Sequence, residues 1–410
     1  MKLRFKRLLI LYLACMAAMH IFVLFSFKDF TIKAYNDFAA FYTAGMIVKE
    51  GQSKRLYDLD LQRQMQAQFA TRAKIKNALL PYVHPPFEAQ LFSLLAYLKY
   101  RQAYLLWTGM QLVFLGLAIF LLMPDGTRTI TNAILLGFLG VGLFPTAMAL
   151  LQGQDSVLLL LIFSSSLFSW RRMHDFLSGS VLAVGLFKFH LVIPIVLIFL
   201  LRRKYKFVLG FALVAILLLL LSAEMVGWSE LIHYPRYLWT LDHTSNEGIT
   251  ALGNMPNIRG VLASIVRTSS LAEVIPWLGL AVGIIFTARS WHGDEESNTV
   301  RSSAGFSLAI IVSMITSYYV YSYEMILLLI PLIVLGKQML DRPEFAGWPR
   351  RSLVLGAGLL FLGPVAWLLI LRTSQFCWYG CAVLLLFLIS LTALLRRTAS
   401  PIIAHEQEEA

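Results

Sequence analysis

Apolar residues in this chain are concentrated in blocks of about twenty, separated by short polar or basic connections. A block of that length is what an α-helix needs to cross a lipid bilayer. The predicted spans are 8–27, 103–123, 130–151, 157–170, two short helices within 172–202, then 207–226, 274–288, 304–320, 325–336, 353–371 and 377–395. The pattern predicts an all-α polytopic membrane protein with about twelve transmembrane helices.

Composition supports this class. The 410 residues are 58% hydrophobic and 14% charged, whereas soluble proteins carry about a quarter charged residues. The net charge of +12 does not indicate nucleic-acid binding, because the Lys and Arg residues are divided between loop ends and one long loop. The apolar stretch 8–27 is long and no small-x-small cleavage site closes it, so the first helix is expected to be uncleaved. Basic short loops face the cytoplasm, which predicts that the N-terminus lies inside, with a single membrane domain over 1–397 and a cytoplasmic tail over 398–410.

Two long connections then fall outside, at 28–87 and 227–273. The short apolar segment Phe87–Leu98 is expected to dip into the outer leaflet without crossing it. Within the first loop, apolar residues at 61, 65 and 69 oppose basic residues at 63, 72, 74 and 76. This pattern is typical of an amphipathic helix that lies in the membrane interface. A helix of the same pattern packed on protein remains an equal alternative.

The first candidate for chemistry is Asp37 in AYNDFAAFYTAG, at the outer end of the first helix. It is either a solvated loop acid or a catalytic base. The loop closes with PYVHPPFEAQ, where each proline forces the preceding residue to be extended. The rigid turn is expected to aim Tyr82 and His84 in a fixed direction.

The segment LLQGQDSVLLL contains a second candidate. Gly153 is expected to end one helix at the outer surface and so expose Gln154 and Asp155. Asp155 stands where a helix N-cap belongs, and capping is the favoured interpretation. Gln154 is a candidate to bind sugar hydroxyls.

A third group of polar residues lies within or next to apolar blocks. Lys188, followed by His190, interrupts one block, and charged groups at membrane depth tend to mark function. A lysine is suited to an anionic group such as phosphate. Arg259 could bind phosphate through two parallel hydrogen bonds, and Asn254 and Asn257 stand beside it. In YYVYSYE, Glu324 is a minor candidate, because an acid at the start of a helix also favours the helix dipole.

Taken in order, these motifs resemble a known family. They are Asp37 with Tyr42 five residues later, GQSKRLYD, the Tyr82 turn with its two prolines, Gly153-Gln154, a lysine in a broken helix, NMPNIRG, and Tyr321-Ser-Tyr323 before a proline. The chain is similar to the GT-C glycosyltransferases, and most similar to glycosyltransferase family 87, the polyprenol-phosphate-mannose-dependent α-mannosyltransferases. It departs from the family at His84, where a tyrosine is usual, and at Phe189, where a proline is usual.

The resemblance implies a GT-C-type bundle in the plasma (inner) membrane with an extracytoplasmic site. It implies transfer of a sugar, mannose by the resemblance, from a polyprenyl phosphate to a glycolipid or glycan hydroxyl with inversion. Asp37 would be the base, with Lys188, Arg259 and His190 at the donor phosphate. Substrate contacts would come from Tyr42, Tyr82, His84, Gln154, Asn254, Asn257, Tyr323 and Glu324.

No cofactor or metal is expected, and the three cysteines are expected to be packing residues. The partners would be the lipid-linked donor, the acceptor and the bilayer, with no nucleic acid. A polytopic transporter or lipid-linked sugar flippase is the main alternative, since it would share the apolar spans and the buried lysine. An inactive assembly protein is the second.

Overall fold

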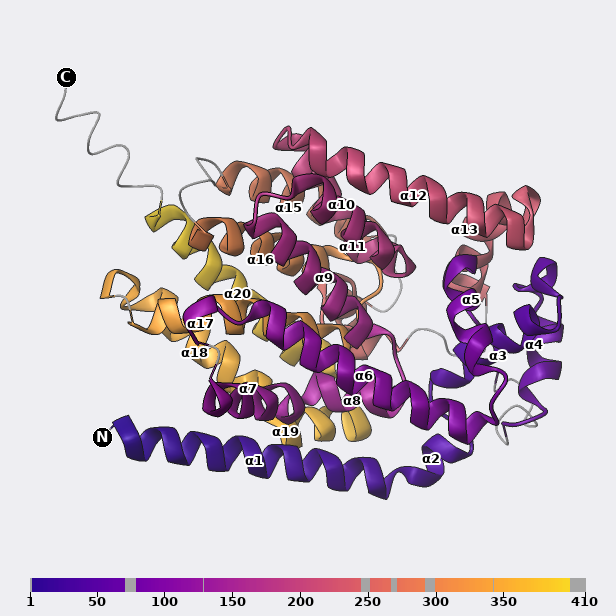
Figure 1. Cartoon of the computed structure of the whole chain (residues 1–410), viewed down its shortest axis with the longest axis horizontal. Helices are drawn as coiled ribbons and strands as arrows, with labels where there is room; N and C mark the ends of the chain where they lie inside the picture. The colour runs from indigo at the N-terminus through magenta and orange to yellow at the C-terminus, as the bar shows by residue number, and fades with distance from the viewer. Residues whose placement is uncertain are drawn as a thin grey trace.

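The computed structural model describes residues 2–70, 79–127, 129–244, 251–266, 271–291, 299–341 and 343–398. Within these ranges the chain is helical and has no strand (Figure 1). Among the described residues, seven stretches are long and apolar enough to cross a membrane, or up to nine if each of two bent pairs is one span. They are α1 (Lys2–Ser26), α6 (Tyr100–Leu122), the stretch Asp175–Leu201, α12 (Tyr205–Val226), α15 (Leu271–Ser290), α16 (Thr299–Thr316) and α20 (Phe376–Arg397). The protein is therefore a multi-pass membrane protein, and the expected count of about twelve is not confirmed.

Two of the expected spans are bent. The first divides into α7 (Ile130–Gly142) and α8 (Phe144–Gln152), which meet at 66°. The second divides into α18 (Trp348–Leu360) and α19 (Gly363–Leu368), followed by a π-helical turn over 369–373, with a bend of 60°. Pro145 and Pro364 stand in the first turn of α8 and α19. Proline lacks the N–H that would continue a preceding helix but fits the first turn of a new one.

The stretch Asp175–Leu201 turns back on itself at Lys188. It consists of α10 (Asp175–Ala183), the 3-10 turn η4 (Val184–Lys188) and α11 (Phe189–Leu201), and it follows α9 (Ser156–Arg171). The Lys188 side chain reaches Asp155 at the start of α9, whereas the Phe199 ring lies 4.8 Å from that of Trp170 at the other end. Because α9 is about 24 Å long, α10 and η4 must run along α9 toward Asp155, and α11 must run back toward Trp170. The stretch therefore forms two short helices.

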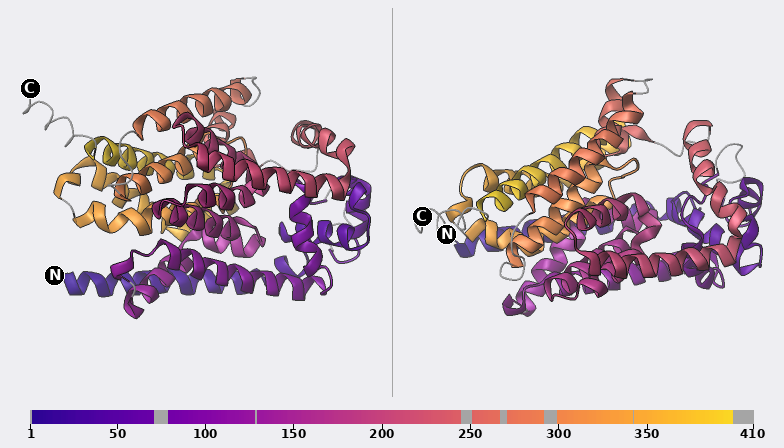
Figure 2. Two further views of the ribbon diagram at one scale, coloured as in Figure 1. Left: turned by 45° about the horizontal axis from the view of Figure 1, so that its top comes forward. Right: turned by 90° about the horizontal axis from the view of Figure 1, so that it is seen from above.

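Short helices gather at one end of the molecule, away from the N-terminus (Figures 1 and 2). They are α2 (Lys28–Ile32), α3 (Phe38–Lys49), α4 (Leu59–Gln66), α5 (Pro86–Leu95) and α13 (Trp228–Thr244). With ten residues, α5 is too short to cross a bilayer. The helices of both expected outer loops thus lie at the same end of the molecule.

Helix α4 packs on protein. Its apolar residues Leu61 and Met65 are buried, and the side-chain oxygen of Gln62 accepts a 2.9 Å hydrogen bond from the Tyr82 backbone N–H. The basic positions 72, 74 and 76 lie outside the described residues. Within the described part of this helix, the contacts favour the packed alternative over a helix lying freely in the interface.

Candidate active site

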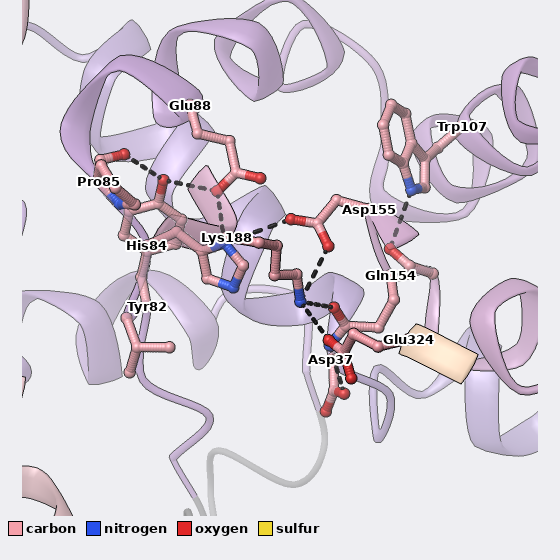
Figure 3. Close-up of polar contacts among 12 residues, drawn as sticks. Asp37, Tyr82, His84, Pro85, Glu88, Trp107, Gln154, Asp155, Lys188 and Glu324 are labelled. Carbon is pink, nitrogen blue, oxygen red and sulfur yellow. Dashed lines mark hydrogen bonds and ion pairs between the residues drawn. The ribbon is translucent and has the colours of Figure 1, made fainter. Parts of the chain in front are cut away.

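The carboxylate of Asp37 is held at the junction of the first loop and the bundle. Asp37 directly precedes α3, but its side chain makes no capping hydrogen bond to that helix. Instead, Oδ2 accepts a 2.7 Å hydrogen bond from Gln154 Nε2 (Figure 3). The backbone N–H of Asp37 donates to Gln152 Oε1 at 3.2 Å. Two glutamines at the C-terminal end of α8 (Phe144–Gln152) thus fix an acid more than a hundred residues away.

Gly153 allows this arrangement. Its φ is +63°, a left-handed conformation that glycine adopts without the steric cost of a Cβ. A Cβ here would lie 2.6 Å from Cβ of Phe38. The Gly153 carbonyl accepts a 2.9 Å hydrogen bond from Trp107 Nε1 (Figure 3). The expected helix break at Gly153 is present, but Gln154 and Asp155 are buried and not exposed as expected. Gln154 contacts Asp37 at the start of α3, whereas Asp155 contacts His84 and Lys188.

Lys188 lies at the centre of the buried polar groups (Figure 3). Its Nζ is 2.8 Å from Glu324 Oε1, 3.1 Å from Asp155 Oδ1 and 3.4 Å from Gln154 Oε1. The contacts with Glu324 and Gln154 are hydrogen bonds, and the contact with Asp155 is an ion pair. Lys188 therefore connects the start of α9 with the 3-10 turn η6 (Glu324–Leu328), which leads into α17 (Leu329–Asp341).

His84 bridges two carboxylates (Figure 3). Its Nδ1 lies 2.9 Å from Glu88 Oε2 and 3.3 Å from Asp155 Oδ2, and Tyr82 donates to the same Glu88 oxygen at 3.1 Å. Burial alone lowers the pKa of His84, but the two carboxylates outweigh it and raise this pKa to about 9. Burial raises the pKa of Glu88 to about 7, against the opposing charge of His84. Around neutral pH, His84 is therefore an imidazolium.

The same three residues could hold a metal ion. His84, Glu88 and Asp155 each offer one ligand atom, and these atoms lie within 4.8 Å of one another. A histidine ligand must be neutral to bind a metal, whereas the two carboxylates favour a proton on Nδ1. The contacts thus fit a shared proton more directly than a metal ion.

These groups surround a cavity of about 230 Å³. Seven residues expected in a site line it: Asp37, His84, Gln154, Lys188, His190, Tyr323 and Glu324. Aromatic and aliphatic side chains form much of the remaining wall: Phe41, Phe187, Phe189, Leu238, Leu241, Tyr319 and Tyr321. The cavity lining therefore combines charged and apolar side chains. These residues come from both expected outer loops and from the bundle.

Five expected site residues do not line this cavity. Tyr42 is buried and donates to the Leu98 carbonyl at 2.7 Å. Tyr82 is also buried, with its ring centroid 5.8 Å from that of His84. Asn257 caps α14 (Ile258–Ile265) by accepting from the Gly260 N–H. Asn254 ends the 3-10 turn η5 (Leu252–Asn254), and Arg259 pairs with Asp242 at 2.5 Å. Their expected roles in substrate binding stay predictions.

The expected role of Asp155 as an N-cap is wrong, because its side chain makes no capping hydrogen bond. Its carboxylate instead contacts Lys188 and His84. Burial raises the pKa of Asp155, but the charges of these two residues outweigh burial and hold that pKa below its usual value. Glu324 does more than favour a helix dipole, since it pairs with Lys188 and accepts from the Tyr321 N–H at 2.6 Å.

Glu88 and Asp242 were not found from the sequence. For Glu88 a signal exists, because His84 and Glu88 are four residues apart where a helix begins, a spacing that brings side chains together. Asp242 gave no signal, since its helix falls in an expected loop.

Comparison with known proteins adds one match. The family model described as glycosyltransferase family 87 matches residues 82–317, more than half of the chain. The matched range includes His84, Gln154, Lys188 and Asp242, whereas Asp37 and Glu324 lie outside it. No curated protein and no solved structure matches significantly.

Proposed function

This chain belongs to glycosyltransferase family 87, and on that premise we propose that it transfers a sugar from a polyprenyl-phosphate donor to a hydroxyl of a glycolipid or glycan. The sugar is mannose by the family resemblance, and the reaction inverts the anomeric centre. The site faces the extracytoplasmic side of the plasma (inner) membrane, where the two outer loops meet. The family match and the apolar helices support the broader class, a membrane glycosyltransferase.

The observation that carries the proposal is the placement of Asp37. Its carboxylate is held by Gln154 at 2.7 Å, at the edge of a cavity that also exposes Lys188 and His84. A carboxylate in a fixed position can take a proton from an incoming hydroxyl. The cations of the same cavity suit a phosphate leaving group. An acid and two cations from three separate parts of the chain thus meet the needs of one reaction.

The reaction balances without a cofactor. The acceptor oxygen forms a bond to the anomeric carbon while the bond from that carbon to the phosphate oxygen breaks. The hydroxyl proton passes to Asp37, and the phosphate leaves as a polyprenyl phosphate anion, so no acid has to protonate it. Attack from the face opposite the phosphate inverts the configuration.

Within this scheme the two cations have different tasks. Lys188 is hydrogen-bonded to Glu324 and Gln154 and paired with Asp155, so it holds the carboxylates and contributes its charge. Among the described residues, no hydrogen bond to His84 Nε2 occurs, while Nδ1 is held by Glu88 and Asp155. His84 therefore offers an N–H donor to the donor phosphate, with His190 beside it in the cavity lining. Phe187, Phe189 and Leu238 suit the first units of the prenyl chain.

The test supplies the purified protein, reconstituted in liposomes, with polyprenyl phosphates that carry radiolabelled mannose, arabinofuranose or glucose, together with a lipid extract as acceptor. We expect label to appear in a glycolipid product for one donor. Movement of the labelled donor across the bilayer without transfer would contradict the proposal and favour a flippase.

A further inference from the structure

Asp242 lies on the face of α13 that is turned toward the cavity. Tyr234 and Tyr237 on this helix donate to the backbone carbonyls of Val83 and Tyr82, at 2.8 and 3.0 Å. These bonds fix α13 against the segment that carries His84. Leu238, Leu241 and Asp242 follow within the next turns and line the cavity. Asp242 is therefore a second aspartate of this cavity, placed by an element independent of Asp37.

The two oxygens of Asp242 differ in their surroundings. Oδ2 accepts from Arg259 at 2.5 Å and from the Tyr318 hydroxyl at 3.0 Å, and His243 Nδ1 lies 3.8 Å from it. Oδ1 is buried and accepts no hydrogen bond within normal geometry from the residues that the structure describes, and the Tyr319 hydroxyl is the further side-chain group that interacts with this carboxylate. The side chain is 3% exposed. A buried carboxylate oxygen without a donor is costly, so a ligand donor at Oδ1 would offset that cost.

The groups around Asp242 fit a sugar. The Arg259 guanidinium balances the carboxylate charge and packs 3.6 Å from the Tyr318 ring. Tyr319 and Tyr321 line the same cavity. Carboxylate oxygens accept from hydroxyl groups, and a few fixed polar groups among aromatic side chains give a binding site its specificity. A phosphate is a poor match at Oδ1, because two anions would meet there.

We propose that Asp242 is a specificity-determining residue whose Oδ1 accepts a hydrogen bond from a sugar hydroxyl of the substrate. The inference rests on the proposed function and adds to it a residue for sugar recognition that is separate from the base. The hydroxyl belongs either to the donor sugar or to a sugar of the acceptor, and the arms of the test distinguish these sources.

The variant Asp242→Asn distinguishes the roles of the two carboxylate oxygens. Arg259 and Tyr318 both donate, so they retain the amide oxygen and turn the amide NH₂ toward the cavity, where a donor replaces the acceptor. Tyr318→Phe is the matched control. It removes one bond to Oδ2, keeps the ring beneath Arg259, and leaves Oδ1 as it is. Tyr318 does not line the cavity.

The measurement compares binding of polyprenyl phosphate and polyprenyl phosphomannose to the full-length protein in nanodiscs, and the KM for the lipid acceptor. If the donor sugar contacts Asp242, the Asn variant should bind polyprenyl phosphomannose about ten- to hundredfold more weakly, as expected for a hydrogen bond to a charged group. Bare polyprenyl phosphate should bind as to wild type. If the acceptor contacts Asp242, the acceptor KM should rise by that factor instead. In both cases Tyr318→Phe should resemble wild type.

Three results would overturn the inference: equally weaker binding of both lipids by the Asn variant, no change in lipid binding or acceptor KM, or the same change in Tyr318→Phe. The first and last results would show that Asp242 acts only by holding α13 in place. Failure of the proposed function gives a different result, because wild type itself would then transfer no sugar from any donor, whether or not it binds the lipids, and both proposals would be overturned.

Discussion

Replacing Lys188 by methionine should destabilise the protein more than it weakens donor binding. The Lys188 Nζ lies 2.8 Å from Glu324 Oε1 and 3.1 Å from Asp155 Oδ1, and all three side chains are at most 5% exposed. Methionine fills a similar volume without charge, so the buried Glu324 loses its cation and Asp155 keeps only His84. Removing one partner of a buried ion pair costs about 3–5 kcal/mol, and we expect a loss of that size in the free energy of unfolding.

A second substitution tests whether the cause is the stranded charge. Adding Glu324→Gln to Lys188→Met makes one carboxylate neutral, so the double variant should be more stable than Lys188→Met alone. The two effects should depart from additivity by about 1–3 kcal/mol, as for residues in direct contact. Lys33→Met is the control, since Lys33 pairs with Asp29 at the surface and should change stability by less than about 1 kcal/mol.

The assay follows thermal unfolding in detergent by the fluorescence of the nine tryptophans, alongside binding of polyprenyl phosphate. We expect a clear fall in the melting temperature of Lys188→Met and partial recovery in the double variant. The reasoning would be refuted if Lys188→Met melted with wild type yet bound polyprenyl phosphate tenfold more weakly, because Lys188 would then be a phosphate ligand with little structural role.

Two further predictions concern pH and the helix break. The pKa of His84 is raised from 6.5 to about 9, so its contribution to stability is fully present below pH 6.5 and lost as pH rises through 9; the melting temperature should fall across this range, and His84→Gln should flatten the fall. A profile unchanged in His84→Gln would contradict the assigned ion pairs. Gly153→Ala should destabilise the protein by at least about 1 kcal/mol, because Gly153 has φ +63° and a Cβ would lie 2.6 Å from Cβ of Phe38. Gly137→Ala, in a helix with open space at this position, should match or exceed wild type in melting temperature, and equal losses in both variants would disprove the steric explanation.

The features that sequence predicted best are those with a local cause. The membrane class follows from apolar blocks, the break at Gly153 from a glycine between polar residues, and the turn at Lys188 from polar residues inside an apolar block. The prediction that Asp37 and Gln154 matter also started from local anomalies, and the structure brings these two side chains to 2.7 Å.

What sequence could not give are partners distant in the chain. Asp155 has a sufficient local explanation as a helix cap, and only the fold shows that Lys188 and His84 bind it instead. Asp242 depends on α13, whose aromatic and polar residues hide its helical pattern within an expected loop. Bends between short helices also escape a reading by length, since Pro145 interrupts a block that otherwise looks like one span.

The most direct test of the central claim is sugar transfer by Asp37→Asn. The asparagine keeps an oxygen for the Gln154 hydrogen bond but cannot take a proton, so the site should stay intact. We expect polyprenyl phosphate to bind as to wild type while transfer of labelled sugar falls about 10²- to 10⁴-fold, the range for a general base. Asp29→Asn, at an exposed acid eight residues earlier, should transfer at the wild-type rate. If Asp37→Asn incorporated label as fast as wild type, Asp37 would not be the base.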